Sequence, residues 1–98
     1  MNPMQQMMMQ AQRMQRELAK AHAELDEQVF TVKKAGIVEI QVKGNRQIVS
    51  INIDESAISP DDKDMIEDAI MMAVNEAMET IQDAHDEVDA RITGQAKK

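Results

Sequence analysis

Histidine and carboxylate side chains are the first candidates for chemistry in this chain, because acid–base catalysis and metal binding both rely on them. The only histidines, His22 and His85, are each isolated from a nucleophile, so no catalytic dyad can be drawn. His85 and Asp89 stand four residues apart, which could bring two metal ligands together on a helix, but nothing fixes a third. We favour a solvated helix face for this pair and expect no metal site.

Catalytic machinery of other kinds is also missing from the sequence. There is no glycine-rich phosphate loop, no Gly-x-Ser-x-Gly elbow and no pair of carboxylates placed across a cleft. The acidic run at 61–68 could bind a cation or mimic DNA, but acids gather in the first turns of helices for dipole reasons alone. We favour the dipole interpretation, and we expect no catalytic residue, no cofactor and no enzymatic activity.

Basic side chains form a second pattern. Arg13, Arg16 and Lys20 lie three and four residues apart, so they share one flank of a helix, away from its apolar stripe. With the basic residues at 33, 34, 43 and 46 they could form a positive track for phosphates, and the lack of aromatic stacking residues disfavours single-strand or RNA binding. The pattern alone favours an ordinary salt-bridged helix face, because Glu17 and Glu24 lie among the same turns.

The composition limits the kind of fold that can hold these side chains in place. A chain of 98 residues forms one domain with a thin core, and Phe30 is its only aromatic residue, so self-association is the expected remedy. The absence of cysteine fits a reducing cytosol, and no signal peptide or membrane span is visible, so we expect a cytoplasmic protein. The net charge of −7 opposes simple nucleic-acid binding. It is polarised, however: residues 1–50 carry seven basic and five acidic side chains, whereas residues 51–98 carry four and thirteen.

Apolar periodicity predicts the elements. A stripe with spacings of three and four predicts a first helix over about 3–27, and three runs of period two predict strands over about 29–33, 37–43 and 46–53. Gly36 marks the first turn, and Gly44-Asn45 predicts a two-residue hairpin because both residues tolerate positive φ. Ser59 and Pro60 begin a second helix that we expect over about 60–93, ending at Gly94.

The predicted fold class is therefore α+β, a single domain of order α-β-β-β-α. Two long helices flank a three-stranded antiparallel sheet whose edges a second copy would hide, while parts of both helices project. The residues expected in the core or at the dimer contact are Met14, Leu18, Val38, Ile40, Val42, Val49, Ile51, Ile53, Ile70, Ala73 and Ala77. The methionines at 4, 7, 8, 9 and 14 either continue the seam between paired helices, which we favour, or bind another protein.

The stretches AGIVEIQVKGNRQIVSINID (35–54) and DKDMIEDAIMMAVNEAMETI (62–81), behind a Met- and Gln-rich first helix, resemble the YbaB/EbfC family of nucleoid-associated DNA-binding proteins. The resemblance covers most of the chain. Its most specific parts are Gly36, the Gly44 hairpin, the strand end at 49–54 and the helix segment at 67–77.

The resemblance implies an intimate homodimer with helices projecting as paired arms, which binds duplex DNA with little sequence preference and organises or regulates the bacterial chromosome on the nucleoid. The resemblance indicates a region that contacts DNA, and not a compact sequence motif. The candidate DNA contacts are Arg13, Arg16, Lys20, Lys33 and Lys34, with Arg91, Lys97 and Lys98 at the end of the second helix as weaker candidates.

One departure from the resemblance keeps an alternative open. The second helix is unusually acidic, and such a surface repels DNA. Either the binding mode turns this helix outward and uses the first helix, or the protein is an interaction module of the same fold that binds an unknown protein, including a basic one by mimicking DNA.

Overall fold

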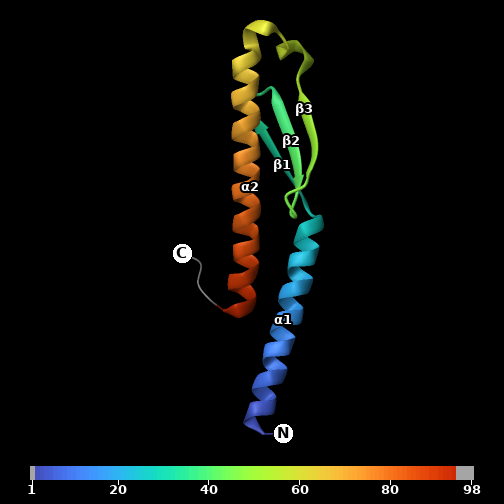
Figure 1. Cartoon of the computed structure of the whole chain (residues 1–98), viewed down its shortest axis with the longest axis vertical. Helices are drawn as coiled ribbons and strands as arrows, with labels where there is room; N and C mark the ends of the chain where they lie inside the picture. The colour runs from blue at the N-terminus through green and yellow to red at the C-terminus, as the bar shows by residue number, and fades with distance from the viewer. Residues whose placement is uncertain (1, 95–98) are drawn as a thin grey trace.

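A computed structural model of the chain describes residues 2–94 and is elongated, with extents of 71 × 25 × 14 Å. Two long helices and a small sheet follow one another in the expected α-β-β-β-α order (Figure 1). The elements are α1 (Pro3–Glu27), β1 (Val29–Lys34), β2 (Val38–Lys43), β3 (Ile48–Ile53), the 3-10 turns η1 (Glu55–Ala57) and η2 (Pro60–Asp62), and α2 (Lys63–Thr93). The predicted fold class is thus confirmed.

Local chemistry explains where the helices begin and end. The Asn2 side chain accepts a hydrogen bond from the Gln5 amide at 2.8 Å, and Pro3 fits the first helical position of α1. Ser59 accepts from the Asp61 amide at 3.2 Å, but the turn that follows is 3-10, so α2 proper begins at Lys63. Gly94 closes α2 with a φ of 75°, a conformation that glycine adopts without strain.

The sheet is antiparallel with the order β1-β2-β3. Val38, Ile40 and Val42 of β2 point toward α2 and are buried, while their neighbours Glu39 and Gln41 point to the opposite, polar face. Directly paired residues share a face, so Val32 and Ile51, the partners of Ile40, lie on the α2 side as well. One face of the sheet therefore carries the core.

The two hairpins differ in how far they follow the prediction. At the first, Ala35 and Gly36 both have positive φ (55° and 68°), as expected for a tight turn at Gly36. At the second, the expected two-residue Gly44-Asn45 connection is wrong: the loop spans 44–47, the positive φ of 72° falls on Arg46, and β3 begins at Ile48. Gly44 is needed for close packing rather than for its φ, because a Cβ there would lie 1.8 Å from the Leu25 carbonyl oxygen.

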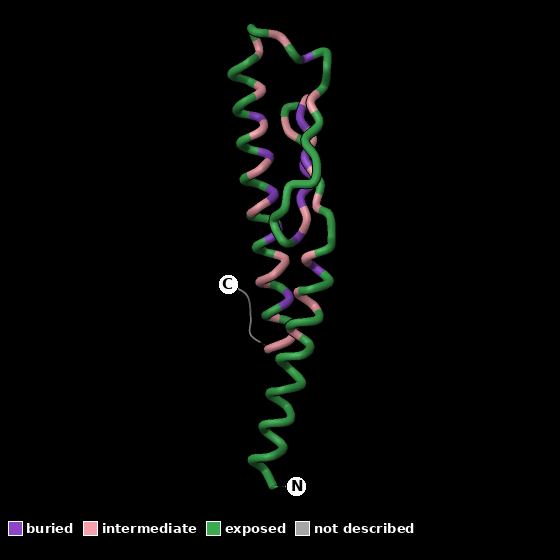
Figure 2. The backbone as a smooth tube through the Cα atoms, turned by 45° about the vertical axis from the view of Figure 1, so that its right-hand side comes forward, coloured by how far each residue is buried: buried purple, intermediate pink, exposed green. Residues whose placement is uncertain are grey.

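Small side chains let α2 lie close to the sheet. Ala69, Ala73, Ala77 and Ile81 have no exposed surface, and they pack on the buried side chains of β1 and β2. A stripe of alanines at spacings of four brings the helix axis near the strands. The purple, buried positions in Figure 2 accordingly run along the inner side of α2 and the facing strands.

The other candidate core residues are not equally covered. Ile53, Ile70 and Leu18 are half-buried, whereas Val49 and Ile51 of β3 are 52% and 47% exposed, and Met14 is exposed as well. The cause is the position of α2, which packs over β1 and β2 and leaves the α2-side face of β3 open. β3 is also an edge strand, so an apolar face and an unpaired strand edge coincide there.

Candidate nucleic-acid interface

The N-terminal part of α1 projects alone beyond the end of α2 (Figures 1 and 2). Residues 3–17 are all exposed, and the first partly buried residue of the helix is Leu18. At 1.5 Å per residue this projecting segment, which we call the arm, is about 22 Å long. It is the part of the described chain most accessible to a large ligand.

Arg13, Arg16 and Lys20 are exposed on or beside the arm. Successive helical residues are rotated by about 100°, which places these three on the face opposite to His22 and Leu25, the residues that turn toward α2. They thus face away from the rest of the protomer. None of the three has a salt bridge within residues 2–94 that would occupy its charge.

The structure separates the charges in space as well as along the chain. The arm contains Arg13 and Arg16 but only one acid, Glu17, whereas α2 carries nine acids against Lys63 and Arg91. Since the arm extends past the C-terminal end of α2, a polyanion that approaches from the end of the arm meets the basic arm before the acidic helix. The negative net charge of the whole chain therefore does not represent the arm, whose basic residues outnumber its single acid.

The other basic candidates do not join the arm. Lys33 is exposed on the polar face of β1, opposite Glu39, while Lys34 points to the other face and forms an ion pair with Glu76 of α2 at 2.6 Å. Both lie at the far end of β1, roughly 40 Å along the chain from Arg13 by helix and strand rise. The positive track that the sequence suggested through Lys33 and Lys34 is therefore not a continuous surface of one protomer.

Two further basic residues of that track are occupied, and the C-terminal candidates are only partly described. Lys43 pairs with Glu27 at 2.8 Å, and Arg46 donates a hydrogen bond to the Gln82 side chain. Arg91 is exposed and lines an open hollow between α1 and α2, close to Glu24 and Glu87. Lys97 and Lys98 lie outside the described residues.

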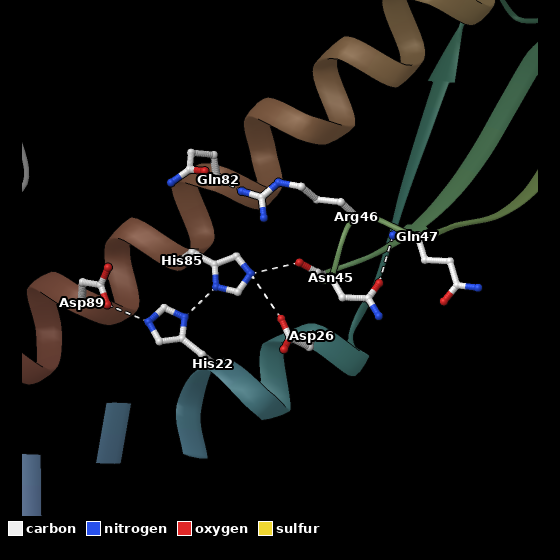
Figure 3. A network of polar contacts seen from close by, with 9 residues as sticks. His22, Asp26, Asn45, Arg46, Gln47, Gln82, His85 and Asp89 are labelled. Carbon is white, nitrogen blue, oxygen red and sulfur yellow. Dashed lines mark hydrogen bonds and ion pairs between the residues drawn. The ribbon is translucent and has the colours of Figure 1, made fainter. Parts of the chain in front are cut away.

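The two histidines meet where α1, α2 and the β2–β3 loop come together (Figure 3). Their Nδ1 atoms are 2.6 Å apart, and the rings stack with centroids 4.8 Å apart and planes inclined by 14°. His22 Nε2 contacts the Asp89 carboxylate at 2.6 Å, and His85 Nε2 contacts the Gly44 carbonyl oxygen at 2.9 Å. The expectation of a solvated face is wrong for His85, whose side chain is only 14% exposed, whereas the Asp89 side chain is 55% exposed.

Sequence reasoning missed this junction because the histidines are 63 residues apart. A signal was nevertheless present, since each histidine directly follows an alanine of its helix's apolar stripe, Ala21 or Ala84. Two stripes that face each other bring such neighbours together. No group of three or more His, Cys, Asp or Glu side chains among residues 2–94 is arranged to hold a metal ion, and no helix there is long and apolar enough to cross a membrane.

Comparison with known proteins identifies relatives along nearly the whole chain. The model of the YbaB/EbfC DNA-binding family matches residues 1–96. A protein of Mycoplasmopsis pulmonis named nucleoid-associated protein is 39% identical over 87 residues, which cover 89% of this chain and 86% of that protein. Similarly named proteins of Agathobacter rectalis and Pelotomaculum thermopropionicum are 38% and 37% identical, over 93% and 96% of this chain and 81% and 90% of theirs.

A solved structure shares the fold. The protein HP0035 of Helicobacter pylori, described as uncharacterized, superposes with a TM-score of 0.76 and covers 95% of this chain and 98% of its own. The sequence identity of 19% means that this likeness concerns the fold alone. It shows that the elongated helix–sheet–helix arrangement occurs in another protein.

Proposed function

Since this chain belongs to the YbaB/EbfC DNA-binding family, we propose that it binds duplex DNA as a homodimer, through the arms and with little dependence on base sequence. The names of its relatives support a place on the bacterial nucleoid and a role in organising the chromosome or regulating genes. The observation that carries the proposal is the arm itself, whose cations Arg13 and Arg16, with Lys20 beside them, face solvent ahead of the acidic α2.

Phosphate contact explains both the affinity and the weak specificity in this proposal. Guanidinium and ammonium groups on an exposed helix flank bind phosphate oxygens, which are the same at every base pair. Each protomer offers three cations, two on the arm and Lys20 beside it, and a dimer offers six. The acidic α2 then faces away from the duplex, where it opposes binding in any other orientation.

The surface of β3 supports the proposal of a dimer. Ile48, Val49 and Ile51 are exposed on a strand whose outer edge has no partner in residues 2–94. Half-buried Ile70, Val74 and Met78 of α2 pack on the core and add apolar surface. A second copy would cover the apolar side chains and the strand edge together, and so enlarge a thin core.

A charge placed on β3 tests the dimer. We expect Ile51→Lys to leave the protomer folded, because residue 51 is already 47% exposed, but to weaken dimerisation by about 100-fold, because the lysine would be buried without a partner. Sedimentation equilibrium at micromolar concentration, with circular dichroism as a check on folding, measures this change. Thr31→Lys, on the opposite and polar face of the sheet, is the matched control. A dimer unaffected by Ile51→Lys would exclude β3 as the contact.

Salt dependence tests DNA binding. If six cations of a dimer contact phosphate, the logarithm of the binding constant falls with a slope of about −5 against the logarithm of salt concentration. Fluorescence anisotropy with two unrelated duplexes should then show a loss of about 1000-fold between roughly 50 and 200 mM salt, similar for both sequences. Affinity that does not change with salt, or no binding at low salt, would overturn the proposal.

A protein-binding role remains the second candidate because of the methionines. Met4 and Met7 on the arm are 71% and 70% exposed, and Met71 and Met72 are exposed on α2. Exposed apolar patches mark contact surfaces, and methionine adapts to varied partners. The acidic α2 would suit a basic protein. Under this alternative, partner binding survives the loss of the arm's positive charge, whereas DNA binding does not.

A further inference from the structure

The partners of His22 and His85 restrict which of their ring nitrogens can carry hydrogen. The Gly44 carbonyl oxygen and the ionised Asp89 carboxylate can only accept hydrogen bonds, so the Nε2 atoms of both rings carry hydrogen. The 2.6 Å contact between the two Nδ1 atoms needs one donor and one acceptor. All of these contacts are satisfied together when the four ring nitrogens hold three hydrogens, an arrangement in which the two rings share a single positive charge.

Any other proton number breaks one of these contacts. A further proton would place hydrogens on both Nδ1 atoms across 2.6 Å and two positive charges in stacked rings. Loss of the shared proton would leave one contact without a hydrogen. Either the two Nδ1 atoms, or one Nε2 atom and its oxygen partner, would then face each other with lone pairs only. Histidine is the side chain that exchanges protons between about pH 5 and 8, so both changes are within experimental reach.

The surroundings match a single positive charge. Asp89 contacts His22, and Asp26 of α1 lies 3.6 Å from His85 Nε2. Arg46, the cation labelled in Figure 3, donates to Gln82, whose amide in turn donates to Asp86 at 2.9 Å. Two carboxylates therefore face the rings directly, while the guanidinium is engaged elsewhere.

The histidines also lie at the contact between α1 and α2, and this contact sets the direction in which the arm projects. Beside the histidines, an open hollow between α1 and α2 is lined by the apolar Ala21, Leu25, Ala84 and Val88 and by the polar or charged Glu24, Gln28, Glu87 and Arg91. This lining contains no aromatic side chain, and an open hollow between two helices resists their relative rotation weakly. The tip of the arm at Met4 is about 27 Å along the helix from His22, so a rotation of about 10° at the junction moves the tip by about 5 Å.

We propose that His22 and His85 form a proton-controlled clasp that holds α1 against α2 below the arm, and so fixes the direction of the arm, when the pair shares one proton, and that releases α1 when both rings are charged. The open state accepts the second proton more readily than the closed state, so acid favours opening. The clasp acts within one chain and without DNA, which takes this inference beyond DNA binding itself. A nucleic-acid ligand would meet a fixed arm near neutral pH and a swinging arm in acid.

Pulsed spin-label distance measurements test the clasp. The chain has no cysteine, so Gln10→Cys and Glu79→Cys, both at exposed positions, allow one label on the arm and one on α2. Labelled chain is diluted into unlabelled chain so that only distances within one chain are recorded. We expect a narrow distance distribution at about pH 7 that broadens by about 5 Å at about pH 5, with unchanged helix content by circular dichroism.

Variants and a direct probe complete the test. His85→Gln and His22→Gln should show the broad distribution at both pH values, whereas Glu76→Gln, which removes the distant ion pair to Lys34, should respond like the natural chain. Nitrogen NMR of the rings should report hydrogen on both Nε2 atoms near neutral pH. A natural chain with the same distribution at both pH values, or with two neutral rings and a fixed arm at about pH 7, would overturn the proposal even if the variants fail to fold.

Discussion

Replacing Arg13, Arg16 and Lys20 together by alanine should weaken duplex-DNA binding by at least about 100-fold at about 0.1 M salt. The three cations are exposed on one helix flank, and no salt bridge within residues 2–94 occupies them. A dimer loses six potential phosphate contacts, so the steep salt dependence should fall to near zero. Anisotropy titrations of both proteins across the same salt series measure the two effects at once.

The control for this triple variant must keep the arm and change only its chemistry. Gln6, Gln10 and Gln12 lie on the same arm and are exposed, so their replacement by alanine preserves helix and length while removing no charge. A second triple variant that keeps the charge, Arg13→Lys, Arg16→Lys and Lys20→Arg, should retain most of the DNA affinity of the natural chain, because phosphate binding depends mainly on charge. An alanine triple variant that binds as tightly as the natural chain would move the DNA contact away from the arm and favour the protein-binding role.

Much of the fold could be predicted from local patterns because each element here obeys its own periodicity. The stripe of α1, the alternation in β2 and the Ser59-Pro60 start of the last helix each depend on neighbours within a few residues. The expectations are wrong where contacts with a distant segment determine the local structure. The β2–β3 loop is two residues longer than expected, because Gly44 and Asn45 form backbone hydrogen bonds to Gln28 and Asp26 at the end of α1.

The candidate site could likewise be predicted where neighbouring residues determine it and could not where distant segments do. The flank shared by Arg13, Arg16 and Lys20 follows from helical geometry alone, and all three residues lie in α1 and are exposed. Lys34 could not be placed from sequence, because its ion pair depends on Glu76, which reaches β1 only after α2 has folded back over the sheet. The histidine junction likewise depends on three segments at once, α1, α2 and the β2–β3 loop.

Substitution of Gly44 by alanine should be the most damaging single change to stability. An added Cβ would lie 1.8 Å from the Leu25 carbonyl oxygen, 2.6 Å from its carbon and 3.2 Å from the Asp26 Cα. These are backbone atoms, so the loop or the end of α1 must move, and the hydrogen bonds from the Gly44 and Asn45 amides to α1 are then lost. We expect a loss of about 3 kcal/mol or more and a fall in melting temperature of roughly 10–20 °C.

Gly36→Ala separates crowding from backbone conformation. Gly36 has a φ of 68° but no atom within 4 Å of an added Cβ, so alanine there suffers only conformational strain, at about 1 kcal/mol. Thermal melts of both variants at equal chain concentration measure the difference. Equal and small losses would show that the β2–β3 loop does not press on α1. A much larger loss at Gly44 would mean that this loop, whose Gly44 carbonyl also contacts His85, braces α1 at the base of the arm.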